Sequence, residues 1–458
     1  MEGVIGVYSK RDVALKALYT LYGVQHRGQE SAGITLAGDR SLRTIKGRGL
    51  VSNVFDERYT KKADSDEYVA VGCASGENGD AEPAPLNLSS GRYRLSLALD
   101  GFMRGRGKRT NEEAFGSLLV ANLRTNGVAR ALEETMKETR GSYYSLVMVF
   151  HDVEANRSSL IAARDQRGVR PLYVAAGNGE LYVTSESAPI DVLENMGVGI
   201  EWRRDFRPGA MIMIDEVGLD EEQVLEPCPA HCAFEWVYFG RPDSVMEGHG
   251  VHEARKRLGH ALVGTHHLRE LYATGRGSRR DLVVIPVPDS GRSVCTGVTE
   301  ALGIPADEGV IKNAYLGRTY IIGDPAFRRV ASDLKHNIIR ETVRGKKVVI
   351  TDDSIVRGTV SESVAKNLRI AGATEVEYLV SYAPIFHACF SDPADKPLAA
   401  APYEGMSLKQ VGDGVAEKLP SIDKVRYNSP ENVVASIGLP SSSICTMCIT
   451  GLNPFEEK

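Results

Sequence analysis

Short apolar runs rich in β-branched residues alternate with polar turns along much of this chain. The clearest run, at residues 347–350, is typical of a strand that is buried on both faces of a parallel sheet. Two adjacent carboxylates follow, Asp352 and Asp353, and then a loop of small and hydroxyl residues. Residues 361–370 have the pattern of a helix that Gly372 would end. The order predicts a strand, a polar loop and a helix.

Such a unit offers backbone N–H groups and the positive end of a helix to a phosphate. The two carboxylates could hold ribose hydroxyls or a hydrated Mg²⁺. A second unit is predicted where the apolar residues 281–287 precede Pro288-Asp289-Ser290-Gly291. Each unit alone could be an ordinary strand–turn–helix with surface acids. The presence of both in one chain favours a phosphate site.

The N-terminal half has a different pattern. Residues 3–9 predict a buried strand, and apolar positions from Ala14 to Leu21 mark one face of a helix that ends near Gly23. Short strands separated by turn residues are predicted across 140–215, which favours antiparallel sheets.

Composition limits the function classes. The 458 residues leave room for two or three domains, and the net charge of −5 with interspersed signs argues against a nucleic-acid surface. No apolar window is long enough for a membrane span, and the first residues lack the pattern of a secretory signal. We therefore expect a cytoplasmic protein that binds neither nucleic acid nor membrane.

The chain has seven cysteines, an odd number without an export signal, so free thiols or metal ligands are favoured over a disulfide framework. Four of them, Cys232, Cys389, Cys445 and Cys448, lie in the second half. Only Cys445 and Cys448 have local ligand spacing, and C-x-x-C is shared by zinc, iron–sulfur and redox sites.

Residues 352–359, Asp-Asp-Ser-Ile-Val-Arg-Gly-Thr, resemble the 5-phosphoribosyl-1-pyrophosphate (PRPP) loop of type I phosphoribosyltransferases. The sequence of these residues is most similar to that of the glutamine-dependent amidophosphoribosyltransferases. Further segments resemble the same family, namely 25–34, 46–52, 162–165, 168–172, 184–186, 207–209, 232–244 and 311–321. The resemblance is strong over residues 232–390. Over residues 1–231 the scaffold segments match the family, but the catalytic segments do not.

This resemblance implies a fold of two domains. Residues 1–222 would form an N-terminal-nucleophile (Ntn) glutaminase-like domain, an α/β/β/α sandwich with two stacked antiparallel sheets. Residues 223–231 would be a linker. Residues 232–458 would form a type I phosphoribosyltransferase domain with a mainly parallel sheet.

The resemblance also implies site residues. Asp352 and Asp353 would hold the ribose and Mg²⁺, with Ser290 near the metal. Lys312 and Arg318, in a loop that closes over PRPP in the family, would neutralise the departing pyrophosphate. The residues expected around the phosphates are Ser354, Ile355, Val356, Arg357, Gly358 and Thr359 for the 5′-phosphate, and Asp289, Ser290 and Gly291 for the pyrophosphate.

The glutaminase chemistry of the family is not matched. Those enzymes use an N-terminal cysteine whose freed amine is the base, but here Met1 precedes Glu2, which we expect to block removal of Met1. Ser75 replaces the arginine that pairs with the glutamine carboxylate. Asp100, followed by Gly101, replaces the asparagine of the oxyanion hole, where a carboxylate would repel the developing charge.

The remaining positions of this pocket partly match the family. Asn111 aligns with an acid that holds the substrate amine, whereas Arg27 and Gly28 match the family. Several losses in one pocket favour a natural pseudo-glutaminase over an engineered knockout. The retained residues could serve structure, or the remodelled pocket could bind another small molecule. Cys73 could be a replacement nucleophile, but a buried thiol is the favoured interpretation.

Cys232, Cys389, Cys445 and Cys448 match the positions that carry a [4Fe–4S] cluster in one branch of the family. Such a cluster would pin the C-terminal segment to the start of the second domain. Zinc and unligated thiols are the alternatives.

The expected activity is displacement of pyrophosphate from PRPP–Mg²⁺ by ammonia to give phosphoribosylamine, without a working glutaminase. Ammonia would come from solution or from a partner glutaminase, and we expect a homo-oligomer. The alternatives are a PRPP-sensing or regulatory subunit of an active homologue and a transferase with another amine acceptor.

Overall fold

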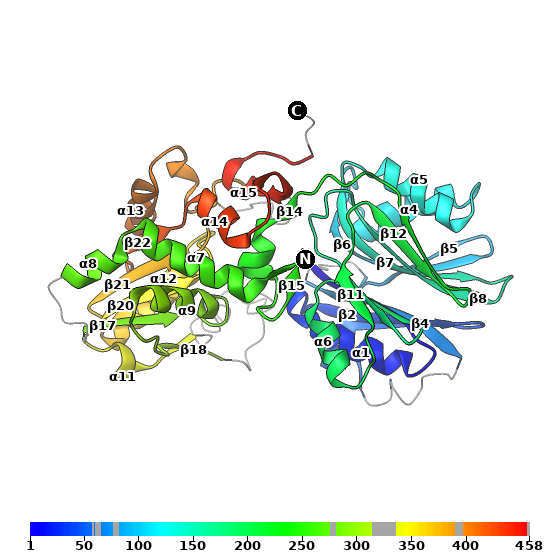
Figure 1. Cartoon of the computed structure of the whole chain (residues 1–458), viewed down its shortest axis with the longest axis horizontal. Helices are drawn as coiled ribbons and strands as arrows, with labels where there is room; N and C mark the ends of the chain where they lie inside the picture. Colours follow the sequence, from blue (N-terminus) through cyan, green and yellow to red (C-terminus); the bar gives the residue numbers. More distant parts are fainter. Residues whose placement is uncertain are drawn as a thin grey trace.

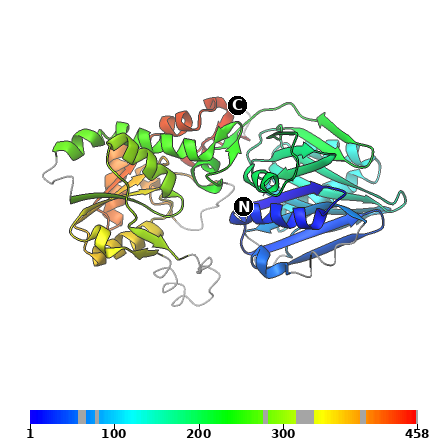
Figure 2. The same cartoon turned by 60° about the horizontal axis from the view of Figure 1, so that its bottom comes forward.

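The computed structural model describes residues 1–56, 59, 66–76, 82–274, 281–313, 336–389 and 397–455. The chain folds into two lobes that lie side by side, the N-terminal one on the right of Figure 1 and the C-terminal one on the left. The lobes stay separate in a view turned by 60° (Figure 2). Among the described residues, no helix is both long and apolar enough to cross a membrane.

Two antiparallel sheets stack face to face in the N-terminal lobe. The strands of the first are β1 (Glu2–Tyr8), β2 (Ser31–Gly38), β3 (Leu42–Arg48), β4 (Glu67–Ser75), β9 (Tyr173–Gly177), β10 (Glu180–Thr184) and β11 (Trp202–Asp205). Those of the second are β5 (Leu86–Ser90), β6 (Tyr93–Phe102), β7 (Tyr143–Asp152), β8 (Arg157–Arg164), β12 (Ala210–Ile214) and β13 (Leu219–Gln223). The orders are β11-β9-β10-β1-β4-β2-β3 and β13-β12-β8-β7-β6-β5.

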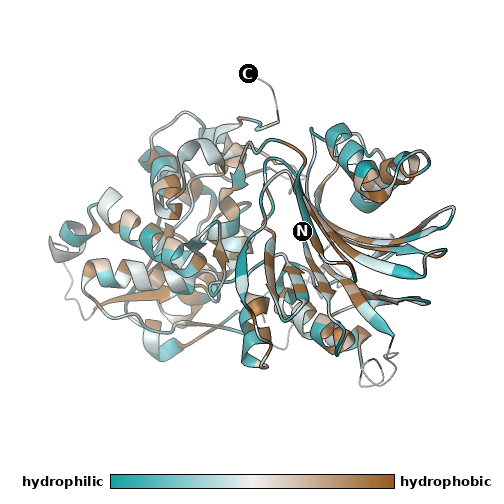
Figure 3. Cartoon of the chain, turned by 45° about the vertical axis from the view of Figure 1, so that its right-hand side comes forward, coloured by the Kyte–Doolittle hydropathy of each residue, from teal (hydrophilic) through white to brown (hydrophobic). Residues whose placement is uncertain are grey.

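Helices cover both outer faces of this pair of sheets. Helices α1 (Val13–Gly23) and α6 (Ala188–Asn195) pack on the first sheet, and α4 (Asn111–Asn122) and α5 (Val128–Glu138) on the second. Short turns of helix, α2 (Val51–Val54) and η1 (Gln25–Arg27), follow β3 and α1. Residues 3–8 of β1 are buried because both faces of the strand are covered. Figure 3 shows apolar residues along the stacked strands. The predicted α/β/β/α sandwich is confirmed.

A parallel sheet forms the centre of the C-terminal lobe. Its strands, in spatial order, are β17 (Leu282–Pro286), β20 (Lys347–Asp352), β21 (Glu375–Val380) and β22 (Lys424–Tyr427). Helices α7 (Val251–Thr265) and α9 (Gly291–Leu302) lie on one face, and α12 (Thr359–Ala371) and α13 (Leu408–Lys418) on the other. The mainly parallel sheet was predicted correctly. It brings the loops after β17 and β20 to the same edge.

Smaller elements complete this lobe. They are η2 (Glu235–Phe239), β15 (Val245–Met246), β16 (His249–Gly250), α8 (Leu268–Thr274), β18 (Val310–Lys312), β19 (His336–Ile338), α11 (Arg340–Val343), η5 (Ala401–Tyr403), α14 (Pro430–Ile437) and η6 (Ser441–Ser443). Helix α8 was not predicted from the sequence. Near the C-terminus, β23 (Ile444–Cys445) pairs in parallel with β14 (His231–Cys232), and α15 (Met447–Thr450) follows.

Candidate active site

The two predicted phosphate loops meet at the carboxyl edge of the parallel sheet. Asp352 ends β20, Asp353 follows it, and both are buried. Ser290 directly precedes α9, and its Oγ donates a hydrogen bond to Asp352 Oδ1 at 3.4 Å. The structure thus brings together side chains that lie 62 residues apart in the sequence.

The two carboxylates are electrostatically strained as a pair. Burial raises the pKa of Asp352 well above its usual value, and the adjacent Asp353 raises it further. Ser354 Oγ donates to Asp353 Oδ2 at 2.6 Å. In the described part of the chain, no lysine or arginine forms an ion pair with either acid. Two carboxylates and a nearby hydroxyl are a donor set that suits Mg²⁺ and ribose hydroxyls.

The loop after β20 presents backbone donors. The N–H groups of residues 354–356 and of Gly358 donate to no other residue that the structure describes. Gly358 has φ +82°, and a Cβ at this position would lie 2.8 Å from the Leu419 side chain, so glycine is required. Helix α12 starts at the next residue, Thr359, and its positive end adds to the attraction for an anion.

The predicted cations are only partly placed. Lys312, at the end of β18, lies 3.1 Å from Asp289 Oδ2 through its Nζ, so it reaches the loop after β17. Arg318 lies outside the described residues. Arg357 belongs to the loop between β20 and α12.

A buried arginine near this site was missed. Arg255 of α7 donates from Nε to Trp236 O at 2.8 Å and from Nη2 to Gly240 O at 2.7 Å. Burial lowers the pKa of its guanidinium, and the nearby Asp353 counters that effect. Several basic residues lie along this part of the sequence, and their pattern does not distinguish inward from outward arginines.

The side chain of Glu2 is buried in the predicted glutaminase pocket. It accepts hydrogen bonds from Ser75 Oγ at 3.1 Å and from Cys73 Sγ at 3.2 Å. Burial raises the pKa of Glu2 well above its usual value, with Glu112 as the next cause, and burial raises that of Glu112 as well. Both carboxyl groups therefore bind a proton more readily than an exposed glutamate does.

Cys73 is buried, as the favoured interpretation of the sequence has it, whereas Asn111 differs from its expected role. Burial raises the pKa of Cys73 well above its usual value, and Glu2 raises it further, which disfavours a nucleophilic thiolate. Asn111 does not face Glu2 but donates from Nδ2 to Gly101 O at 2.9 Å. Glu112, the next residue, interacts with Glu2 instead, and no pattern in the sequence distinguishes the two positions.

Arg27 is fully buried at the centre of an ionic cluster beside Glu2. It donates to Glu186 Oε1 at 2.8 Å, to Asp100 Oδ2 at 3.2 Å and to both carboxylate oxygens of Glu235 at 3.0 Å. Its neighbour Gly28 is required because a Cβ there would lie 2.2 Å from a backbone oxygen of β4.

Arg170 completes this cluster, to which we refer below as the Arg27 cluster, formed by Arg27, Asp100, Arg170, Glu186 and Glu235. Arg170 donates to Glu235 Oε1 at 2.8 Å. Burial opposes ionisation of Asp100, but Arg170 and Arg27 lower its pKa below the usual value. Asp100 is therefore an ion-pair partner, in addition to its predicted unsuitability for an oxyanion hole.

Three separate segments bring four cysteines near one another, namely Cys232, Cys389, Cys445 and Cys448. Cys232 and Cys445 are direct partners in the β14–β23 pair. Burial raises the pKa of Cys448, and the neighbouring Cys389 and Cys445 raise it further. The described cysteines are free thiols. Among the described residues, however, no group of three or more His, Cys, Asp or Glu is arranged to hold a metal ion.

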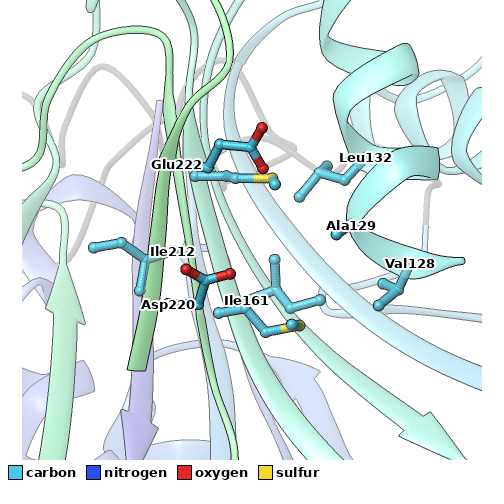
Figure 4. A pocket seen from close by; sticks show the side chains of 9 residues that line it. Val128, Ala129, Leu132, Ile161, Ile212, Asp220 and Glu222 are labelled. Carbon is cyan, nitrogen blue, oxygen red and sulfur yellow. The ribbon is translucent and has the colours of Figure 1, made fainter. Parts of the chain in front are cut away.

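A cavity lies away from both sites, between α5 and strands β8, β12 and β13 (Figure 4). Leu132, Ile161 and Ile212 line it together with Asp220 and Glu222. Its volume of ≈ 10 Å³ is about that of one water molecule, so it cannot take a substrate.

Known proteins resemble the chain over its whole length. The amidophosphoribosyltransferase of Mycobacterium tuberculosis (strain ATCC 25618 / H37Rv) is 32% identical over 484 residues, which cover 99% of this chain and 86% of the relative. The amidophosphoribosyltransferase of Methanocaldococcus jannaschii is 32% identical over 495 residues, which cover 100% of this chain and 98% of the relative. No protein-family model matches.

A solved structure is similar in fold. The glutamine PRPP amidotransferase from B. subtilis complexed with ADP and GMP has a TM-score of 0.81 and 29% sequence identity, covering 99% of this chain and 97% of that one. At this level of identity and coverage, the chain belongs to the amidophosphoribosyltransferase family of enzymes.

Proposed function

We propose that this chain binds PRPP and displaces its pyrophosphate with an amine, most simply ammonia, to give 5-phosphoribosylamine. The observation that carries the proposal is the meeting of the Ser290 loop with Asp352 and Asp353, beside the N–H groups of residues 354–356 and Gly358, which donate to no other residue within the described part of the chain. Residues 232–458 would form the transferase domain, and residues 1–222 the glutaminase-like domain.

Each loop would bind a different part of PRPP. The 5′-phosphate would accept hydrogen bonds from the N–H groups of residues 354–359 at the start of α12. The carboxylates of Asp352 and Asp353 would accept from the ribose hydroxyls. The pyrophosphate would lie at residues 289–291, where Lys312 adds a positive charge.

Ser290, Asp352 and Asp353 would hold Mg²⁺. When bound, the ion would offset charge on the pyrophosphate and relieve the repulsion between the two acids. The amine nitrogen would form its bond to C1 of the ribose as the C1–O bond breaks, with that electron pair leaving on pyrophosphate. The protein residues mainly position PRPP and balance its charge.

We further propose that the glutaminase half is inactive, so ammonia comes from solution or from a partner glutaminase. Glu2 takes the place of the nucleophile, and its carboxyl group is already engaged by Ser75 and Cys73. Asp100 is engaged by Arg27 and Arg170. A pocket filled by its own side chains has little room for glutamine.

The thiols of Cys232, Cys389, Cys445 and Cys448 are proposed to bind a [4Fe–4S] cluster. Their mutual influence on pKa and the β14–β23 pairing support one shared site. A cluster is itself several atoms wide, so its sulfur ligands lie further apart than those of a single ion. This would explain why the described residues offer no compact set for one metal ion. The role would be to pin α15 to the start of the second lobe.

The direct test incubates the protein with PRPP and Mg²⁺, with and without ammonia, and follows pyrophosphate. Ammonia-dependent release is expected. PRPP binding without release would contradict the proposal and would instead support a PRPP-sensing subunit. Release with another amine but not with ammonia would identify a different acceptor.

A further inference from the structure

Thr351 is a buried hydroxyl at the last position of β20 before the two acids. Successive side chains of a strand point to opposite faces of the sheet. Val348 and Ile350 pack on the face covered by α12, whereas Val349 packs on the face covered by α9. Thr351 therefore points toward α9, and its exposed fraction is 0%. A polar group in such a place requires a partner.

The partner of the Thr351 side chain is the first residue of α9. Thr351 Oγ1 donates to Gly291 O at 3.1 Å. Cys295 lies one turn further along α9, and burial raises the pKa of its thiol to about 11, an effect that Thr351 counters. The hydroxyl of Thr351 thus connects the strand to the start of the helix.

The backbone of Thr351 also contacts the loop after β17. Its carbonyl oxygen accepts a hydrogen bond from Val287 N at 2.9 Å. A Cβ at Gly291 would lie 2.2 Å from the same oxygen, so only glycine allows this contact. The loop after β17 is therefore held to the end of β20 at both of its ends, Val287 and Gly291.

These bonds lie one residue away from the groups that would meet PRPP. Ser290 precedes Gly291, and Asp352 follows Thr351, so the Thr351–Gly291 bond sets the separation between Ser290 Oγ and Asp352 Oδ1, which is 3.4 Å. We propose that the Thr351 hydroxyl is a positioning group that holds the pyrophosphate loop against the ribose- and metal-binding acids. The inference rests on the proposed function of this site.

Matched substitutions test the proposal. Thr351→Val keeps the shape but removes the side-chain hydrogen bond to Gly291 O, and it should raise the KM for PRPP roughly tenfold with a smaller change in kcat. Thr351→Ser keeps the hydroxyl and should stay within about twofold of wild type. Thr299→Val removes another hydroxyl of α9, which donates to Cys295 O at 2.9 Å, and should leave KM unchanged. Thermal melting of each variant checks folding.

Equal KM values for Thr351→Val, Thr351→Ser and wild type would overturn the proposal. If Thr351→Val does not fold, Thr351→Cys takes its place, because a thiol keeps only a weak donor. Its KM for PRPP should exceed that of wild type by less than about tenfold. A wild-type KM for Thr351→Cys would overturn the proposal. Calorimetric titration of PRPP–Mg²⁺ distinguishes a failure of the proposed function from a failure of the role proposed for Thr351. Wild type that neither binds nor turns over PRPP contradicts the proposed function, whereas equal binding by wild type and Thr351→Val contradicts only the role of Thr351.

Discussion

Arg27 of the N-terminal lobe and Glu235 of the C-terminal lobe form a buried bidentate ion pair, with Nη1–Oε2 and Nη2–Oε1 distances of 3.0 Å each. Glu186 reinforces the same junction by accepting from Arg241 N and Ser244 Oγ at 2.8 and 2.7 Å. Charge-assisted bonds of this geometry are directional, so they fix how the lobes meet. The predicted glutaminase pocket therefore borders an interdomain junction.

Replacing Arg27 should destabilise the protein strongly. Arg27→Met leaves the carboxylates of Asp100, Glu186 and Glu235 buried without a shared partner, so we expect a loss of about 3–5 kcal/mol in unfolding free energy. Urea denaturation measures it. Arg130→Met, which removes an exposed arginine paired with Glu133, should cost less than about 1 kcal/mol. Similar losses for both variants would show that the Arg27 cluster does not stabilise the junction.

The raised pKa of the buried Glu2 should make stability depend on pH. Burial, then Glu112, raises the pKa of Glu2 in the folded state, so the folded protein binds more protons than the unfolded chain. The associated stability is present below the ordinary glutamate pKa of about 4.3 and is lost as pH rises toward the folded value.

Glu2→Gln removes this titrating group, because the amide stays neutral at every pH. Its urea midpoint should fall less between pH 5 and pH 8 than that of wild type. Glu133→Gln, at a surface position of α5, serves as the control and should follow wild type. Parallel pH profiles for wild type and Glu2→Gln would contradict a raised pKa of Glu2 in the folded protein.

Asp352→Asn should remove most of the transferase activity. The amide keeps the size of the side chain but loses the charge proposed to hold Mg²⁺ and ribose, so kcat/KM should fall by roughly 100-fold or more. Pyrophosphate release measures the effect. Asp413→Asn, at an exposed position paired with Lys409, should behave as wild type. Full activity of Asp352→Asn would mean that the site is placed wrongly.

Iron and acid-labile sulfide should be present in protein purified without oxygen, at about four of each per chain if the cluster is fully loaded. Cys445→Ser and Cys448→Ser should lose both. Cys228→Ser should keep them, because this exposed cysteine is outside the proposed set. Zinc without sulfide, or no metal at all, would contradict the cluster.

The proposed PRPP site at the carboxyl edge of the parallel sheet could be predicted because the residues of each loop are contiguous in the sequence. The strand, the two acids and the start of α12 are contiguous, and the same holds for β17 and residues 288–291. The Arg27 cluster could not be predicted in the same way. Glu186 and Glu235 are single acids in separate segments, and only the folded chain brings them to Arg27. Thr351 was missed because one hydroxyl at the end of an apolar run has no distinctive pattern.

The most direct test of the central claim compares glutamine with ammonia as the nitrogen source for pyrophosphate release from PRPP. Our account predicts turnover with ammonia, none with glutamine, and no formation of glutamate, because we propose that Glu2, Ser75 and Asp100 occupy the positions that glutamine hydrolysis would need. Turnover with glutamine, with one glutamate formed for each pyrophosphate released, would contradict it.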